Sequence, residues 1–274
     1  MFNNQPSDNE NHALHSPTSS SDHAERKAIG EKDPGSNLQT YITLQNYNPI
    51  TQYLHSIRYR HVKEFLSTVV SPQHPMNILE IGCGYGKSLE AIKQCKSFNL
   101  KRYLGIDIDS QFIEFCQKNH PEAAYQFLNA NICEYAKNNI PLPFIPTAVI
   151  ALECFEHIEE SEIPGLIQWI ASLNCPLFIS VPNEVGPAIL LKNIGSYLMR
   201  YVRHQEYTWP ETFSAAVYKL EQVEPHGTGH KGFDWHWLLA VINQKFKIFK
   251  VGTSPWNFIP RFVSPSIYFY CKPR

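Results

Sequence analysis

A short stretch, residues 77–90, constrains the fold of this chain more than any other. It reads NILEIGCGYGKSLE: an apolar run, three glycines at alternate positions, and then residues of helix-compatible composition. The pattern predicts a strand, a glycine-rich loop and a helix, in that order. Glycines let the backbone of such a loop pass close to a ligand, and the free amides at the start of the following helix face that ligand. The stretch therefore predicts a binding site for a nucleotide-like molecule.

The spacing of the glycines distinguishes between kinds of ligand. The dinucleotide fingerprint G-x-G-x-x-G requires glycine at position 87, where the chain has Lys87. The P-loop G-x-x-x-x-G-K-[ST] requires glycine at position 81, where the chain has Ile81. Neither phosphate-binding motif fits. What remains is an acidic residue followed by alternating glycines: Glu80, Gly82, Gly84 and Gly86.

This arrangement resembles the first motif of class I S-adenosylmethionine-dependent methyltransferases. The resemblance implies that these four residues bind the cofactor S-adenosyl-L-methionine. A second apolar run, 102–109, ends in acid, and Asp107 lies 21 positions beyond Gly86, the length of one helix plus one strand. The ribose-binding acid of Rossmann-like folds belongs at this position. The resemblance therefore gives the ribose to Asp107 and the neighbouring adenine contact to Ile108.

Two later segments extend the resemblance. After a predicted third strand at 125–128 come Asn131 and Ile132, and the family often has aspartate at the position of Asn131, accepting from the adenine amino group. The carbonyl oxygen of asparagine can accept the same hydrogen bond. After a fourth strand at 147–152 comes ECFEH, which is similar to the LE-x-x-EH segment of small-molecule methyltransferases and adds Glu153 to the cofactor site and His157 to the candidate catalytic residues. The Asn/Asp-Pro-Pro-aromatic and Pro-Cys segments of base-modifying and RNA cytosine enzymes do not occur at this place.

The order of the predicted elements indicates the fold. Five strand signals, the last at 176–181, alternate with helical patterns, which predicts an α/β fold with a doubly wound parallel sheet. Two more strands are predicted at 246–252 and 266–271, and the family resemblance makes the end of the sheet antiparallel. We therefore expect a Rossmann-like, seven-stranded, mainly parallel sheet with an antiparallel last strand and helices on both faces. A helix with apolar residues three and four apart, from Ile50 to Val69, precedes the first strand and, by resemblance, packs beside the cofactor site.

The N-terminal segment and a long insertion divide the chain into predicted regions. Residues 1–38 contain almost no large apolar side chain, so we expect a flexible polar tail before a methyltransferase domain at 39–274. A long insertion, about 185–225, follows the fifth strand near the edge where ligands bind in open α/β sheets, and it is interpreted as a substrate lid. Its apolar and aromatic residues alternate with cations such as Lys192, Arg200 and Arg203, so a helix at a membrane interface is the alternative.

The segment 226–237, HGTGHKGFDWHW, holds three histidines. The spacing of His226 and His230 is that of half a helical zinc pair, but Gly227 and Gly229 argue against a helix. No second acidic or cysteine cluster lies nearby in the sequence, so no metal is expected. Related methyltransferases often have a histidine and an aromatic residue here, which implies an active-site loop with His230 facing the substrate.

Composition narrows the class of partner. The net charge is −1 and the isoelectric point about 6.9, so no global basic field would recruit nucleic acid or an anionic membrane, and no nucleic-acid partner is expected. Seven cysteines are scattered without a C-x-x-C pair, which is typical of a reducing compartment. No apolar stretch is long enough to span a membrane, so we expect a cytoplasmic protein, with peripheral membrane contact left open. Nothing in the sequence indicates an oligomeric state.

The chemistry follows from the charge of the cofactor. Its methyl group sits on a positively charged sulfur, so the enzyme must mainly align the reactants and exclude water. An oxygen or nitrogen acceptor also loses a proton, and His157 and His230 are the candidate catalytic bases. We expect a methyltransferase of class EC 2.1.1.- that acts on a small-molecule or lipid-linked acceptor, on oxygen rather than nitrogen. An RNA methyltransferase and a non-catalytic adenosylmethionine-binding module remain as alternatives.

Overall fold

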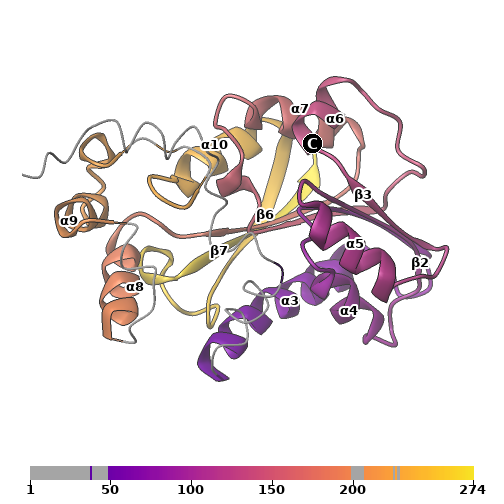
Figure 1. Cartoon of the computed structure of the whole chain (residues 1–274), viewed down its shortest axis with the longest axis horizontal. Coiled ribbons are helices and arrows are strands. Elements are labelled where there is room, and N and C mark those ends of the chain that lie inside the picture. Colours follow the sequence, from indigo (N-terminus) through magenta and orange to yellow (C-terminus); the bar gives the residue numbers. More distant parts are fainter. Residues whose placement is uncertain (1–37, 39–48, 199–206, 225, 227–228) are drawn as a thin grey trace, which may run out of the picture.

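A mixed seven-stranded sheet forms the centre of the molecule (Figure 1). The computed structural model describes residues 38, 49–198, 207–224, 226 and 229–274. The strands lie in the order β3-β2-β1-β4-β5-β7-β6, with the first five parallel and β7 antiparallel to both of its neighbours. This is the predicted Rossmann-like sheet. Its strands are β1 (Met76–Ile81), β2 (Leu100–Asp107), β3 (Tyr125–Asn129), β4 (Ala148–Leu152), β5 (Leu177–Pro182), β6 (Phe246–Thr253) and β7 (Ser266–Pro273).

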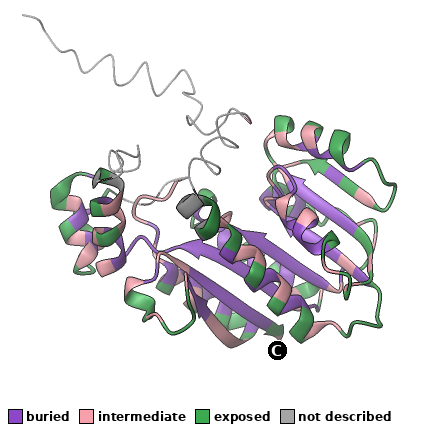
Figure 2. Cartoon of the chain, turned by 90° about the horizontal axis from the view of Figure 1, so that it is seen from below, coloured by how far each residue is buried: buried purple, intermediate pink, exposed green. Residues whose placement is uncertain are grey.

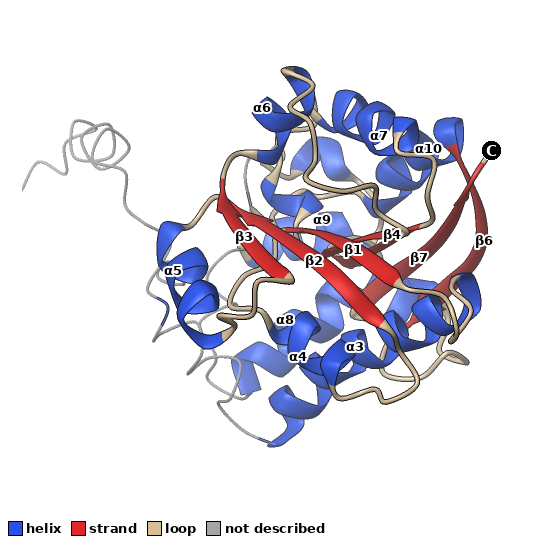
Figure 3. Ribbon diagram, turned by 90° about the vertical axis from the view of Figure 1, so that its right-hand side faces the viewer, coloured by secondary structure: helices blue, strands red, loops and turns tan. Residues whose placement is uncertain are grey.

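Helices cover both faces of the sheet (Figures 1 and 3). One face carries α3 (Pro49–Val69), α4 (Lys87–Lys93) and α5 (Ser110–Asn119), whose apolar residues form one core with the strands. The other face carries α6 (Ile132–Lys137), α7 (Ile163–Ser172) and α10 (Trp235–Lys245), which form the second core. The predicted covering of both faces is confirmed.

The central strands β4 and β5 are buried at every position, and Figure 2 shows the sheet as mostly buried. Continuous apolar runs of this kind are typical of parallel strands covered on both faces. The strand order reverses between β1 and β4, where the chain turns from building one half of the sheet to the other. Ligands bind outside the carboxyl ends of the strands at such a switch point.

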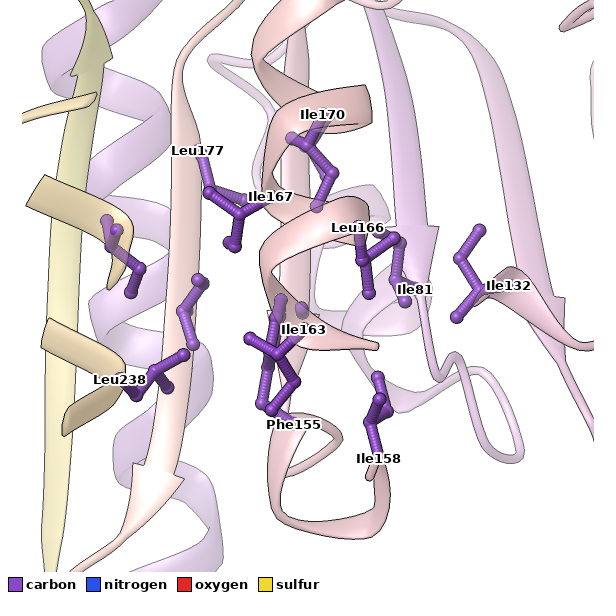
Figure 4. Packing of buried hydrophobic residues seen from close by; sticks show 14 of the residues in the cluster. Ile81, Ile132, Phe155, Ile158, Ile163, Leu166, Ile167, Ile170, Leu177 and Leu238 are labelled. Atoms are coloured by element: carbon purple, nitrogen blue, oxygen red, sulfur yellow. The ribbon is translucent and has the colours of Figure 1, made fainter. Parts of the chain in front are cut away.

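Helix α7 fixes the segment that follows β4. Ile163, Leu166, Ile167 and Ile170 recur at helical spacing and pack towards the strands that carry Ile81 and Leu177 (Figure 4). Pro164 stands in the first turn of the helix, where its missing amide costs nothing. Phe155 and Ile158 belong to the same core (Figure 4), so the short 3₁₀ helix Phe155–His157 is held by buried side chains on both sides of Glu156 and His157.

Two helices lie within the predicted insertion, α8 (Pro187–Leu198) and α9 (Trp209–Ala216). They pack on each other through a small cluster of their own that includes Ile189 and Ala215. Helices α6 and α9 are absent from the sequence prediction. The predicted tail, 1–38, lies almost wholly outside the described residues, as do Arg200 and Arg203. Within the described part of the chain, no helix combines the length and the apolar character needed to cross a membrane.

Candidate active site

The glycine loop between β1 and α4 leaves space on one side and is closed on the other. Gly82 has φ of 69°, and a Cβ there would lie 2.8 Å from both Cβ and Sγ of Cys154, so only glycine lets the loop approach the end of β4. Gly84 has φ of 49°, and a Cβ there would meet nothing within 4 Å. The open side of the loop at Gly84 is therefore where a ligand can come close to the backbone.

Glu80 lies beneath this loop. Its buried carboxylate accepts hydrogen bonds from Ser88 Oγ at the start of α4 and from the Tyr103 hydroxyl of β2. Burial raises the pKa of Glu80 to about 8 against the pull of these two donors. Glu80, Gly82 and Gly84 line a small hollow, together with Arg58 of α3. Helix α3 therefore lies beside the glycine loop, as predicted.

Asp107 closes the other side of the loop. Its Oδ2 accepts from the Gly84 amide at 2.8 Å and its Oδ1 from the Asp109 amide at 3.0 Å, while burial raises its pKa. The next residue, Ile108, is 72% exposed, which is unusual for so large an apolar side chain. The structure thus places an acid and an exposed apolar surface side by side next to the glycine loop.

Asn131 already has a local role. It caps α6, where its Oδ1 accepts from the amides of Cys133 at 2.9 Å and Glu134 at 3.4 Å. Ile132 follows in the first turn and is 8% exposed. A contact from the Asn131 carbonyl oxygen to adenine would have to be made in addition to this cap.

The chain leaves β4 through a left-handed residue, Glu153, with φ of 49°. Its amide donates to the Ser180 carbonyl at 3.0 Å, and its Oε1 accepts from Ser180 Oγ at 3.1 Å. Its Oε2 lies 3.9 Å from Nη2 of Arg58. Glu153 is therefore fixed between β5 and α3, one residue beyond the strand end.

Glu156, His157 and His230 form a cluster that the sequence does not reveal. Nδ1 of His230 lies 3.9 Å from Oε1 of Glu156, and the rings of His157 and His230 are 5.1 Å apart at 72°. One ligand atom of each residue lies within 4.8 Å of those of the other two. Glu156 is fully buried, and burial, with the charge of Glu153, raises its pKa well above its ordinary range. Two histidines separated by 73 positions thus meet at one carboxylate, and such a set can hold a proton or a metal ion.

His226, the sequence neighbour of His230, does not join this cluster. Its ring packs on Phe233, and its Nδ1 lies 3.3 Å from the Lys231 carbonyl oxygen. The four-residue spacing of His226 and His230 therefore has no ligand-forming counterpart in the structure.

Comparison with known proteins identifies the kind of domain that part of the chain forms. Residues 78–176, from within β1 to the residue before β5, match the sequence profile described as a methyltransferase domain. This region contains the glycine loop, Asp107, Asn131 and the segment from Glu153 to His157. Over these residues the chain therefore carries a methyltransferase domain. No curated protein matches the chain.

Several solved structures share this fold. The CurJ carbon methyltransferase is 14% identical with a TM-score of 0.58 and covers 92% of this chain and 64% of its own. The methyltransferase domain of bacterial CtHen1 is 16% identical with a TM-score of 0.53, over 80% and 98% of the two chains. A putative S-adenosylmethionine-dependent methyltransferase from Listeria monocytogenes is 13% identical with a TM-score of 0.50, over 77% and 97%. Identities this low show a common fold and leave the acceptor open.

Sequence reasoning missed the residues that join the insertion to the methyltransferase sheet. Glu184 is fully buried, and its Oε1 lies 2.6 Å from Nζ of Lys192 on α8. Asn183 accepts from Nε1 of Trp235 at 3.0 Å and donates to the Ser264 carbonyl at 2.9 Å. These bonds connect the end of β5 with α8, α10 and the loop before β7. One sequence signal points to Asn183: the segment that ends β5, with Pro182, Asn183 and Glu184, is similar to the SxPN ending of this strand in related methyltransferases.

The outer surface of the insertion is apolar. An open groove between α8 and α9 is lined by Pro187, Leu190, Phe213, Ala216 and Val217, with polar residues at its rim. Large apolar side chains on these two helices, and Val217 just after α9, are exposed: Leu191, Ile194, Tyr197, Trp209, Phe213 and Val217. Patches of this kind mark surfaces that bind a partner or a ligand.

Proposed function

We propose that this methyltransferase transfers the methyl group of S-adenosyl-L-methionine to a hydroxyl oxygen of a small-molecule or lipid-linked acceptor. One observation carries the proposal: His157 and His230 meet beside a buried carboxylate at the carboxyl edge of the sheet, next to the cofactor half of the site. An oxygen acceptor must lose a proton as the methyl group arrives, and this pair of imidazoles supplies groups that can receive it.

The cofactor side of the proposal uses the residues around the glycine loop. Asp107 and Ile108 would hold the ribose and one face of the adenine, and Asn131 and Ile132 would border the adenine from the start of α6. Gly82, Gly84, Gly86 and Glu153 would border the methionine portion. Glu80 would act from beneath, because its carboxylate is already engaged with Ser88 and Tyr103.

The reaction needs alignment more than covalent help from the protein. The cofactor supplies a methyl group on positively charged sulfur, so a carbon–oxygen bond forms as a carbon–sulfur bond breaks and the charge on sulfur is lost. The glycine loop and Asp107 would orient one reactant, and the segment after β4 would orient the other. His230 would receive the acceptor's proton directly or through His157.

The acceptor class follows from the insertion. The apolar groove and the exposed aromatic side chains of α8 and α9 would cover an apolar acceptor as a lid. The net charge of −1 disfavours a polyanionic substrate such as RNA. All seven cysteines are free thiols, which fits the reducing cytoplasm in which we place the activity.

Calorimetry with the cofactor tests the first half of the proposal. Asp107→Ala removes a partly buried carboxylate and should weaken binding about 10- to 100-fold, the usual loss for hydrogen bonds to a charged group. Asp109→Ala is the matched control, since Asp109 caps α5 two residues further along and its backbone amide bond to Asp107 is retained. Equal cofactor affinities in Asp107→Ala and Asp109→Ala would show that Asp107 does not bind the cofactor.

Labelled cofactor in a cell extract tests the second half. Methyl label in an organic-soluble or small-molecule fraction, on an oxygen by mass spectrometry, is the expected result. Label that is released only by nuclease would replace the proposal with RNA methylation. If adenosylhomocysteine never accumulates with any extract, the domain is a binding module without turnover.

A further inference from the structure

Three carboxylates follow β4 and β5, and they differ in how their charge is balanced. Glu153 faces Arg58 at 3.9 Å, and Glu184 faces Lys192 at 2.6 Å. Glu156 is fully buried and faces only the His230 ring, at 3.9 Å, and neither of its carboxylate oxygens has a hydrogen-bond partner among the residues that the structure describes. A carboxylate buried without a partner is costly, so a site of this kind is completed by a proton or by a cation.

The surroundings of Glu156 favour a cation with nitrogen ligands. One ring nitrogen of His157, one of His230 and one carboxylate oxygen of Glu156 lie within 4.8 Å of one another. Ligands at about 2.0–2.2 Å from one ion lie about 3–4 Å apart, so small rotations of the side chains would close the site. Arg58 is engaged with Glu153 at 3.9 Å and with the His55 ring nitrogen at 3.0 Å.

All three side chains are carried by fixed segments. Phe155 and Ile158, which flank Glu156 and His157, are buried in the core beneath α7. The loop that carries His230 is held by the fully buried Phe233 and by a 2.8 Å bond from the Gly232 amide to the Tyr207 hydroxyl. A binding site built on such supported positions keeps its geometry without its ligand.

We propose that Glu156, His157 and His230 bind one divalent first-row transition-metal ion, with zinc as the reference ion. Two imidazoles and one carboxylate are a ligand set that such ions take, and imidazole ligands disfavour Mg²⁺ and Ca²⁺. Three protein ligands leave positions open for oxygen atoms of another molecule. Through them the ion would bind the acceptor oxygen and lower the pKa of its hydroxyl, so that the proton would pass to solvent water instead of to the metal-bound imidazoles. This role rests on the proposed function, whereas the binding of the ion does not.

Calorimetric titration of the chelator-treated full chain with Zn²⁺ tests the site without cofactor or acceptor. We expect one site of about micromolar affinity or tighter in the wild type. His157→Gln, His230→Gln and Glu156→Gln should each weaken binding at least about tenfold, the scale of losses around metal sites. His226→Gln is the matched control on the loop of His230, and it should leave the affinity unchanged because His226 packs on Phe233 instead. Absorption of Co²⁺ in the visible range would report the same ligand loss independently.

Three results would overturn the site: no Zn²⁺ binding by the wild type at about 100 µM, wild-type affinity in all three ligand variants, or equal weakening by His226→Gln. Thermal unfolding separates lost binding from lost folding, and the partly exposed His230 is the variant that disturbs the core least. The failure of this inference is distinct from that of the proposed function. Methyl transfer without Zn²⁺ binding would contradict only the metal site. Zn²⁺ binding without methyl transfer to any acceptor would contradict only the proposed function.

Discussion

The proposed cofactor half and the proposed acceptor half of the carboxyl edge are stabilised in different ways. In the cofactor half, around the glycine loop and the end of β2, each buried carboxylate has its own donors: Glu80 has two hydroxyls and Asp107 two backbone amides. In the acceptor half, after β4 and β5, Glu184 depends on the cation Lys192, and Glu156 has no hydrogen-bond donor among the described residues.

This difference indicates how each half of the site would bind its ligand. A carboxylate satisfied by the protein itself shapes the backbone around it and leaves the ligand to backbone amides and open space, as at Gly84. A buried carboxylate without donors is completed only when something else arrives. The buried carboxylates of the proposed cofactor half are therefore satisfied by the protein alone. In the proposed acceptor half, Glu156 would gain its partner from the molecule or ion that binds there.

The largest expected effect is the pH dependence of the free energy of unfolding that Glu80 causes in the cofactor half. Burial raises the Glu80 pKa from its ordinary 4.5 to about 8, so the folded chain holds a proton that the unfolded chain releases in this window. The free energy of unfolding should therefore fall as pH rises from about 4.5 to about 8, by as much as about 5 kcal/mol. Urea unfolding across this range measures the slope, and Glu80→Gln should flatten it. Parallel slopes in the two proteins would show that Glu80 ionises alike in both states.

The next effect tests the ion pair of the acceptor half. Lys192→Met leaves the fully buried Glu184 without its 2.6 Å cation and should lower the free energy of unfolding by about 3–5 kcal/mol. The double variant Lys192→Met/Glu184→Gln should recover most of this loss, as measured by denaturant titration. Lys87→Met on the cofactor side is the control: its 2.9 Å pair with Glu90 is exposed, so the change should stay below about 1 kcal/mol. Equal losses from the two lysines would remove the contrast between the halves.

The same contrast explains what the sequence could predict. The cofactor half is encoded locally: Glu80, the glycines and Asp107 lie within 28 residues, and their spacing reflects one strand, one loop, one helix and one strand. The strands themselves were readable because buried parallel strands are continuous apolar runs. Helices α6 and α9 were missed because six and eight residues are too few to show a helical period.

The acceptor half is encoded by contacts between distant segments. Sequence proximity pairs His230 with His226, whereas the fold pairs it with Glu156 and His157 from the end of β4. The burial of Glu184 against Lys192 leaves no local pattern, because an acid followed eight residues later by a lysine is equally common on exposed surfaces. Which charges become buried is decided by tertiary packing, and a single sequence does not display it.

A smaller effect separates two glycines of the loop. Gly82→Ala combines a strained φ with a Cβ 2.8 Å from Cys154 and should cost about 2–3 kcal/mol of unfolding free energy. Gly84→Ala meets open space, so it should cost only about 1 kcal/mol, from the left-handed backbone alone. Its methyl group enters the space of the ligand, however, and calorimetry should show weaker cofactor binding at nearly native stability. A Gly84→Ala protein with native cofactor affinity would move the ligand away from this side of the loop.

The smallest change in stability is expected on the proposed lid. Phe213 on α9 is 56% exposed and lines the apolar groove, so Phe213→Ser should change the free energy of unfolding by less than about 0.5 kcal/mol. If the groove holds the acceptor, the dependence of the methyl-transfer rate on acceptor concentration should shift to higher concentration, while cofactor affinity stays constant. Ile145→Ser is the matched control, because Ile145 is 82% exposed in the loop that enters β4 at the opposite edge of the sheet. An unchanged dependence in Phe213→Ser would mean that the acceptor half is completed at the histidine cluster alone and that the apolar surface of α9 serves another contact.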